Sequence, residues 1–147
     1  MRLTDPATFL LLVEDDEGHR LLIRENLKAG GLACRVVEMP DGREALDYLF
    51  RRGRYQEPAK SPRPSVILLD IRMPRADGFA VLEKVKADPE LRHLPVIMLT
   101  STDDQTEVNR CYALGANSYV VKSVRYEEFQ ERVRALGAFL NMVWLAE

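Results

Sequence analysis

The chain has 147 residues, 46% of them hydrophobic and 30% charged, which suits one globular domain with a sizeable core. Its formal net charge of −2 argues against a broad basic surface, so we expect neither nucleic acid nor a membrane as a partner. No apolar run approaches the ~20 residues that span a bilayer, and the first residues lack a signal-peptide layout. The two cysteines, Cys34 and Cys111, form no C-x-x-C pair, so we expect reduced thiols in a cytoplasmic protein.

Five apolar stretches along the chain are each followed by an amphipathic one. The apolar stretches predict strands over residues 9–13, 33–37, 66–70, 96–100 and 117–121. A helix is expected after each strand, the first over residues 17–29, the third from about residue 79 to 87, and the last from near residue 125. This alternation is typical of a parallel sheet covered by helices on both faces. We therefore predict an α/β fold with one doubly wound, five-stranded parallel sheet in the order 2-1-3-4-5.

Two pairs of residues have the spacing of a capping box at a helix start. Asp41 stands three residues before Glu44, and Thr102 stands three residues before Gln105. We expect them to begin the second and fourth helices.

Residues 53–64 interrupt the regular spacing of the elements. They contain three prolines and a glycine, and in residues 51–64 five basic residues stand against one acid, Glu57. The connection is long beside the ~4–6 residues that are usual in compact domains. Two interpretations remain open, a solvated surface loop or a segment that contacts a partner.

The most informative stretch is residues 66–74. Val66 to Leu69 form a continuous apolar run, as in a strand buried on both faces. Asp70 follows this run, before a turn marked by Pro74 and by Asp77-Gly78. A carboxylate has no packing reason to end a buried strand, but ligands of open α/β sheets bind at the carboxyl ends of strands. We therefore predict that Asp70 does chemistry at this edge of the sheet.

Polar residues also follow three other predicted strands and share this edge. They are Glu14, Asp15 and Asp16 after the first strand, Thr100 and Ser101 after the fourth, and Lys122 after the fifth. Converging carboxylates suit Mg²⁺, which binds one or two carboxylates with water and phosphate oxygens. A lysine and a hydroxyl at the same point would complete a phosphoryl site, in which an aspartate can carry the group covalently.

These residues stand in motifs that resemble those of response-regulator receiver domains of two-component signalling, which have a flavodoxin-like fold. The resemblance covers nearly the whole chain, in family-like order and spacing. The matching motifs are Val13-Glu14-Asp15-Asp16, Leu68-Leu69-Asp70-Ile71-Arg72-Met73-Pro74 with Asp77-Gly78, Leu99-Thr100-Ser101, and Gly115-Ala116 leading to Tyr119-Val120-Val121-Lys122.

The resemblance implies a role for each matching residue. Asp70 would be the phosphoacceptor, and Glu14 and Asp15 with Asp70 and the backbone carbonyl of Arg72 would bind Mg²⁺. Thr100 and Lys122 would contact the phosphoryl group, and Tyr119 would move inward with Thr100 as a switch. The expected reaction is transfer from a kinase phosphohistidine to the aspartate, followed at most by slow self-hydrolysis, so we do not expect an enzyme.

The chain departs from the family pattern at one position. Serine stands at position 123, where the family usually has proline after the lysine, in a cis peptide. A cis bond before a non-proline residue costs roughly 3–4 kcal/mol. We expect either a trans Lys122–Ser123 bond with an altered loop or a cis bond held by dense contacts.

A narrower resemblance concerns the 53–64 connection and the apolar tail from Phe139 to Leu145. Both are similar to single-domain regulators that serve bacterial phytochrome histidine kinases. The resemblance implies such a kinase as partner and a homodimer through the last strand, the last helices and the tail. We expect Trp144 and Leu145 to be interface residues, and residues 1–147 to be a single receiver domain with an extended C-terminal helix or tail at about 139–147. No DNA-binding segment follows, so output would be by protein contact.

Two other functional classes stay open. One is a non-phosphorylated, receiver-like interaction module, towards which Ser123 is the one visible step. The other is a hydrolase with an aspartyl-phosphate intermediate. Such hydrolases commonly carry a second acid two residues after the nucleophile, to serve as acid–base catalyst. Here that position is Arg72, which argues against efficient turnover.

Overall fold

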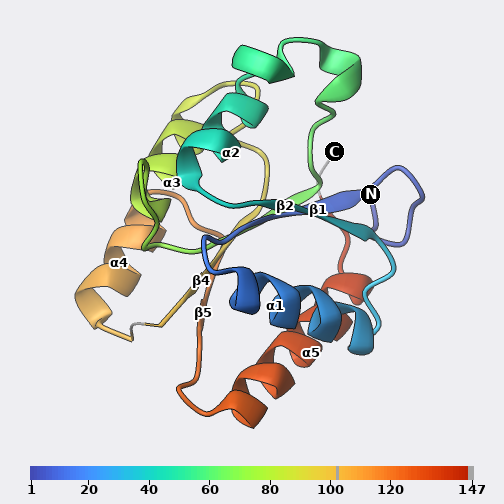
Figure 1. The fold of residues 1–147 in the computed structure, drawn as a ribbon, viewed down its shortest axis with the longest axis vertical. Coiled ribbons are helices and arrows are strands. Elements are labelled where there is room, and N and C mark those ends of the chain that lie inside the picture. Colours follow the sequence, from blue (N-terminus) through green and yellow to red (C-terminus); the bar gives the residue numbers. More distant parts are fainter. Residues whose placement is uncertain (102, 146–147) are drawn as a thin grey trace.

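The computed structural model describes residues 1–101 and 103–145 and contains one five-stranded parallel sheet (Figure 1). The strands are β1 (Phe9–Val13), β2 (Arg35–Met39), β3 (Val66–Leu69), β4 (Val96–Thr100) and β5 (Ser118–Val121). Their order is β2-β1-β3-β4-β5, and every neighbouring pair is parallel. The predicted flavodoxin-like topology is therefore confirmed.

Five helices cover the two faces of the sheet. They are α1 (Glu17–Ala29), α2 (Gly42–Leu49), α3 (Gly78–Ala87), α4 (Gln105–Ala113) and α5 (Tyr126–Met142). Helices α1 and α5 lie on one face, and α2, α3 and α4 on the other (Figure 1). Alternate residues of the central strands enter opposite cores: Leu68 packs with the α1 and α5 side chains, whereas Leu69 packs with those of α2 and α3. Burial on both faces explains the continuous apolar runs of β1, β3 and β4.

Some predicted boundaries are shifted. The second strand begins at Arg35 rather than at residue 33, because the ladder to β1 starts at the Phe9–Arg35 pair. The backbone N–H of Ala33 instead donates to Asn141 Oδ1 of α5, at 3.1 Å. Strand β3 ends one residue before Asp70, and β5 begins at Ser118.

The helix starts differ in detail from the predicted capping boxes. Asp41 does cap α2, since its Oδ1 accepts from the Glu44 N–H at 2.8 Å, but the Glu44 carboxylate accepts from the Tyr55 hydroxyl at 2.7 Å. Thr102 lies outside the described residues. The N-cap of α4 is Asp104, which accepts from the Thr106 N–H.

The connection after α2 lies on the surface but is ordered. It contains two short 3₁₀ helices, Gly53–Tyr55 and Pro58–Lys60. The Oγ atom of the fully buried Ser61 lies 2.9 Å from the carbonyl oxygens of both Tyr55 and Glu57, which share its one hydroxyl hydrogen. The Tyr48 hydroxyl of α2 donates to the Pro62 carbonyl at 2.6 Å. Most residues between 52 and 60 are exposed, which fits both the surface-loop and the partner-contact interpretation.

The two ends of the described chain pair with each other. The Leu145 N–H donates to the Met1 carbonyl at 2.7 Å, and Arg2 and Trp144 form an antiparallel bridge. The Arg2 guanidinium lies 5.4 Å from the centre of the Trp144 ring. Leu145 therefore packs within the molecule, whereas the Trp144 side chain stays 75% exposed. None of the helices among the described residues is both long and apolar enough to cross a membrane.

Helices α1 and α5 approach very closely at two glycines. A Cβ atom on Gly137 would lie 2.4 Å from the Leu27 carbonyl oxygen, and one on Gly30 would lie 2.0 Å from that of Arg134. Beside them, Arg134 Nε donates to the buried Asn26 Oδ1 at 2.9 Å. The two helices thus form one closely packed layer on this face of the sheet.

Replacing Gly137 with Ala tests this contact. In a free helix the change would be favourable by roughly 0.5–1 kcal/mol, but here the added methyl should cost ~1–3 kcal/mol because backbone atoms have to move. Urea unfolding of the variant should show a lower midpoint, whereas Ala138→Ser, at an exposed neighbouring position, should stay within about 0.5 kcal/mol of the parent. A Gly137→Ala protein as stable as the parent would disprove the close approach.

Candidate functional site

The sheet register brings the predicted site residues to one edge. Strands β1 and β3 are neighbours, with Val13 opposite Leu69, so Glu14 and Asp70 leave the sheet side by side. The Asp70 N–H donates to the Val13 carbonyl at 3.0 Å, which extends the ladder by one residue. On the far side of β3, the Lys122 N–H donates to the Thr100 carbonyl at 2.7 Å. Four different strands therefore deliver side chains to the same place.

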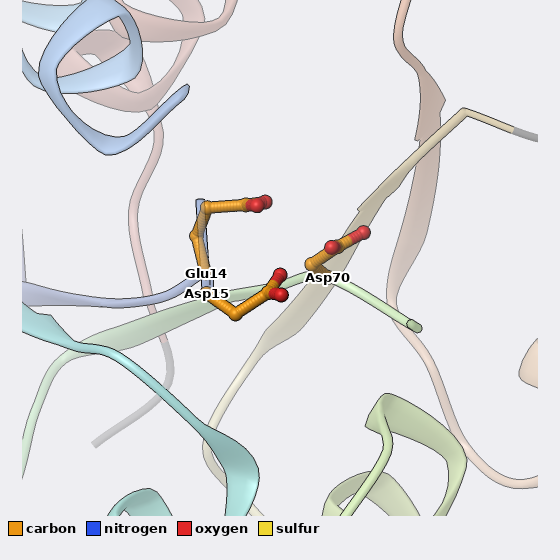
Figure 2. Close-up of side chains that lie close together, drawn as sticks. All are labelled: Glu14, Asp15 and Asp70. Atoms are coloured by element: carbon orange, nitrogen blue, oxygen red, sulfur yellow. The ribbon is translucent and has the colours of Figure 1, made fainter. Parts of the chain in front are cut away.

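Three carboxylates converge at this edge. One oxygen each of Glu14, Asp15 and Asp70 lies within 4.8 Å of the others, and the three side chains gather at the end of β1 and β3 (Figure 2). Glu14 is 2% exposed and Asp70 8% exposed, whereas Asp15 is open to solvent. Carboxylate oxygens at this spacing, with one side open to water, are a donor set that suits a hard divalent cation.

Asp16 does not belong to this group. Its Oδ1 accepts from the His19 N–H at 2.9 Å and so caps α1, and this hydrogen bond lowers the pKa of the Asp16 carboxyl. The structure thus separates the acid that begins the helix from the two that face Asp70.

Lys122 is buried between the acids. Its Nζ lies 2.8 Å from Glu14 Oε2 and 3.8 Å from Asp70 Oδ1. A buried ammonium requires paired, hydrogen-bonded surroundings, because an unpaired charge in the interior is very costly. The position of Lys122 in the interior agrees with the prediction that it belongs to the site.

The pKa of Asp70 is raised to about 7. Burial is the main cause, the negative charge of Glu14 adds to it, and Lys122 acts in the opposite direction. The ammonium of Lys122 therefore does not fully offset the burial of Asp70 and the charge of Glu14, and the site favours additional positive charge.

Thr100 and Tyr119 lie next to this group. Thr100 ends β4 and is 1% exposed, whereas its neighbour Ser101 is exposed. Tyr119 of β5 packs against the core on the α2–α4 side. Burial raises the pKa of Tyr119 to about 12, and a side-chain hydrogen bond with Thr100 opposes this shift. The two residues of the predicted switch are thus in contact.

Arg72 points away from the acids. Its guanidinium is exposed, and Nη2 pairs with Glu107 Oε1 of α4 at 2.7 Å. A role for Arg72 at the site would therefore fall to its backbone carbonyl, as predicted from the family motif, and this role stays a prediction.

The Lys122–Ser123 peptide bond is trans. Ser123 Oγ accepts from the Arg125 N–H at 3.1 Å, just before α5 begins. The serine thus provides a local turn at the position where the family pattern has proline, which is the first of the two expected outcomes.

Sequence reasoning missed His19. Its side chain is 46% exposed. The ring lies at the site, with Nδ1 3.2 Å from Lys122 Nζ and 3.8 Å from Glu14 Oε1. Its place in the first turn of a helix that starts at the acidic edge was the signal that could have revealed it.

Comparison with known proteins agrees with this geometry. A model of the response regulator receiver domain family matches residues 10–134. Response regulator Rcp1 of Synechocystis sp. is 33% identical over 136 residues, which are 92% of this chain and 90% of Rcp1. Two crystal structures superpose over 95% of this chain and 99% of theirs at 33% identity. They are the phosphorylated cyanobacterial phytochrome response regulator RcpA, with a TM-score of 0.86, and Mn²⁺-bound Rcp1, with a TM-score of 0.88.

The chain therefore belongs to the response-regulator receiver domain family of two-component signalling. Its similarity to Rcp1 and RcpA places it close to regulators associated with phytochrome signalling.

The pKa of Asp70 predicts how stability depends on pH in the metal-free protein. The folded-state value of about 7 lies above the ~3.9 of an unfolded aspartate. Stability should therefore fall as the pH rises from about 4 to about 7, because the unfolded state loses this proton first. Asp70→Asn removes the effect, and should raise the free energy of unfolding by at least ~1 kcal/mol at pH 8 and by less at pH 5.

Urea unfolding in EDTA at both pH values measures this difference. The exposed Asp103→Asn is the matched control and should show no gain at either pH. An Asp70→Asn gain that does not change with pH would contradict the burial argument.

Proposed function

We propose that this protein is a phosphorylation-dependent response regulator that accepts a phosphoryl group on Asp70 from a histidine kinase, with Mg²⁺ as cofactor. The observation that carries the proposal is the meeting of three carboxylates, a buried ammonium and a buried hydroxyl at one sheet edge. A phosphorylated structure of the similar regulator RcpA supports it.

In the proposed reaction an Asp70 oxygen attacks the phosphorus of the donor phosphohistidine. The new O–P bond forms as the N–P bond breaks, and the imidazole nitrogen leaves with the bonding pair. Lys122 Nζ lies 3.8 Å from Asp70 Oδ1 and would neutralise an incoming phosphoryl oxygen. The Thr100 hydroxyl, at the end of β4, would donate to another. Such a site works by positioning and charge neutralisation, without an acid–base residue, so the protein would be a switch with at most slow self-dephosphorylation rather than an enzyme.

Glu14, Asp15, Asp70 and the Arg72 carbonyl would hold the Mg²⁺. When bound, the ion would supply positive charge that favours ionised Asp70 and offsets charge on the phosphoryl oxygens. Of the three carboxylates, only Asp15 is exposed, so the ion would enter from its side.

The signal would leave the site through Thr100 and Tyr119. Because these residues share a hydrogen bond, a Thr100 hydroxyl drawn to the phosphoryl group would release Tyr119. Tyr119 lies on β5, which is the edge strand beside α4. The face built from β5 and the last two helices would then change its affinity for a partner.

The proposed partners are a sensor histidine kinase, with the bacterial phytochrome kinases as the candidate group, and a second copy of the chain. The kinase assignment rests on similarity to RcpA, which is itself a phytochrome response regulator. The homodimer would form through β5, the last helices and the tail. Exposed apolar side chains there include Phe139, Met142 and Trp144. Strand β5 lies at the edge of the sheet, and an edge strand is a ready site for association. We also propose a cytoplasmic protein in which residues 1–147 make a single receiver domain with its C-terminal tail at about 139–147.

A second candidate function is a receiver-like interaction module that is never phosphorylated. The trans Lys122–Ser123 bond favours it, since this loop departs from the family pattern at the predicted phosphate-binding lysine. The phosphorylation experiment separates the two candidates.

Brief incubation with acetyl phosphate and Mg²⁺ should add one phosphoryl group, detected by intact-mass spectrometry. The adduct should be lost in Asp70→Asn and in EDTA, because the acceptor oxygen or the cation is then missing. A parallel reaction with a purified phosphorylated histidine kinase covers strict kinase dependence. Absence of an adduct from both donors would favour the interaction module.

The proposed homodimer is tested by Phe139→Ser combined with Met142→Ser. These side chains are 54% and 70% exposed, so the change should spare the core and weaken dimerisation by at least ~10-fold in Kd. Sedimentation equilibrium measures the constant. Leu21→Ser, at an exposed leucine of α1, is the control and should leave it unchanged. A double variant that dimerises as the parent does would place the interface elsewhere.

A further inference from the structure

His19 contacts the functional lysine. Its Nδ1 lies 3.2 Å from Lys122 Nζ, in the first turn of α1. A lysine ammonium has three N–H donors and no acceptor, so the imidazole has to be the acceptor in this hydrogen bond. Nδ1 therefore carries the lone pair, and the ring proton is on Nε2.

We propose that His19 is a positioning residue for Lys122, and that it orients the ammonium towards the phosphoryl group on Asp70. This inference rests on the proposed function, because it assigns a task within the same reaction. It adds a residue that lies outside every family motif recognised in the sequence.

The argument follows from counting the donors of the ammonium. Glu14 Oε2 accepts one N–H at 2.8 Å, and His19 Nδ1 accepts a second. Two acceptors fix the rotation of the NH₃⁺ group about the Cε–Nζ bond. The third hydrogen is left for the side of Asp70, whose Oδ1 lies 3.8 Å away, beyond hydrogen-bond distance but within the reach of an added phosphoryl oxygen.

The His19 ring is itself held in place. It stands edge-on to Phe129 of α5, with ring centres 5.9 Å apart and an interplanar angle of 85°. Its backbone N–H donates to the Asp16 cap. Since α1 packs tightly against α5 at Gly137, the helix that carries His19 Nδ1 is held in place. The peptide bond after Lys122 is trans, so this loop lacks the cis proline of the family pattern. The contact with His19 from α1 is a second restraint on the lysine, separate from this loop.

Three substitutions at His19 separate the acceptor from the shape of the ring. Asparagine can place Oδ1 where Nδ1 now lies, glutamine carries its oxygen one bond further out, and leucine fills space without an acceptor. The half-exposed position should tolerate all three, which thermal unfolding checks. The rate constant of phosphorylation by acetyl phosphate at saturating Mg²⁺ is the main readout.

We expect His19→Leu and His19→Gln to lower this rate constant by about ten-fold. This change corresponds to ~1.4 kcal/mol, the size of a hydrogen bond to a charged group. His19→Asn should stay within about three-fold of the parent. The midpoint of Mg²⁺ stabilisation should change little, since the three carboxylates are untouched. In a Lys122→Met background, His19→Leu should have no further effect. Equal losses in the asparagine and leucine variants, or a full effect without Lys122, would overturn the proposal.

A second readout does not depend on phosphorylation. In ¹⁵N NMR spectra at pH 8, His19 should carry its proton on Nε2, and the Nδ1 signal should shift in Lys122→Met. A proton on Nδ1, or a signal that ignores Lys122, would disprove the positioning role. If the parent protein takes up no phosphoryl group but gives the expected spectrum, the proposed function fails and the His19–Lys122 contact stands.

Discussion

The whole site depends on an imbalance of buried charge. Glu14 and Asp70 are almost inaccessible to water and share one ammonium, that of Lys122. Burial raises the pKa of Asp70, the charge of Glu14 adds to this shift, and Lys122, 3.8 Å away, opposes it. The acids at this edge are therefore short of positive charge, and a divalent cation would supply it.

The rest of the fold keeps this imbalance in place. Central strands with apolar residues on both faces commit β1, β3 and β4 to the interior, and their register leaves no choice about which side chains emerge at the edge. The close contact of α1 with α5 fixes the side of the site that carries His19. On the other side, the loop after Asp70 is tied to α4 through Arg72 and Glu107. A structural change at Asp70 would thus be opposed on one side by the close packing of α1 and α5. On the other side it could pass through polar contacts towards α4 and β5.

The fold and most of the candidate site were predictable from the sequence, because apolar strand patterns and the polar residues that follow them point to the same arrangement. The runs before Asp70 and Thr100 are continuous and apolar, and the acids and the lysine follow strands, so topology alone brings Glu14, Asp15, Asp70 and Lys122 together. The start of β2 was misplaced because Ala33 is as apolar as a strand residue, and only the hydrogen bond to Asn141 removes it from the ladder. His19 and the capping role of Asp16 were missed because both depend on side-chain direction within one helical turn, which spacing does not determine.

The pairing of the two chain ends gives the molecule a built-in optical reporter. Trp144 is the one tryptophan in the sequence, and it lies exposed beside the Arg2 guanidinium. Helix α5 has 17 residues, so its far end lies about 25 Å from the end near Lys122. The emission of Trp144 therefore does not respond directly to binding at the acidic edge. A spectral change on binding at that edge would report a change at the paired residues 1–2 and 144–145, through motion or through association, and it could be followed in real time without any label.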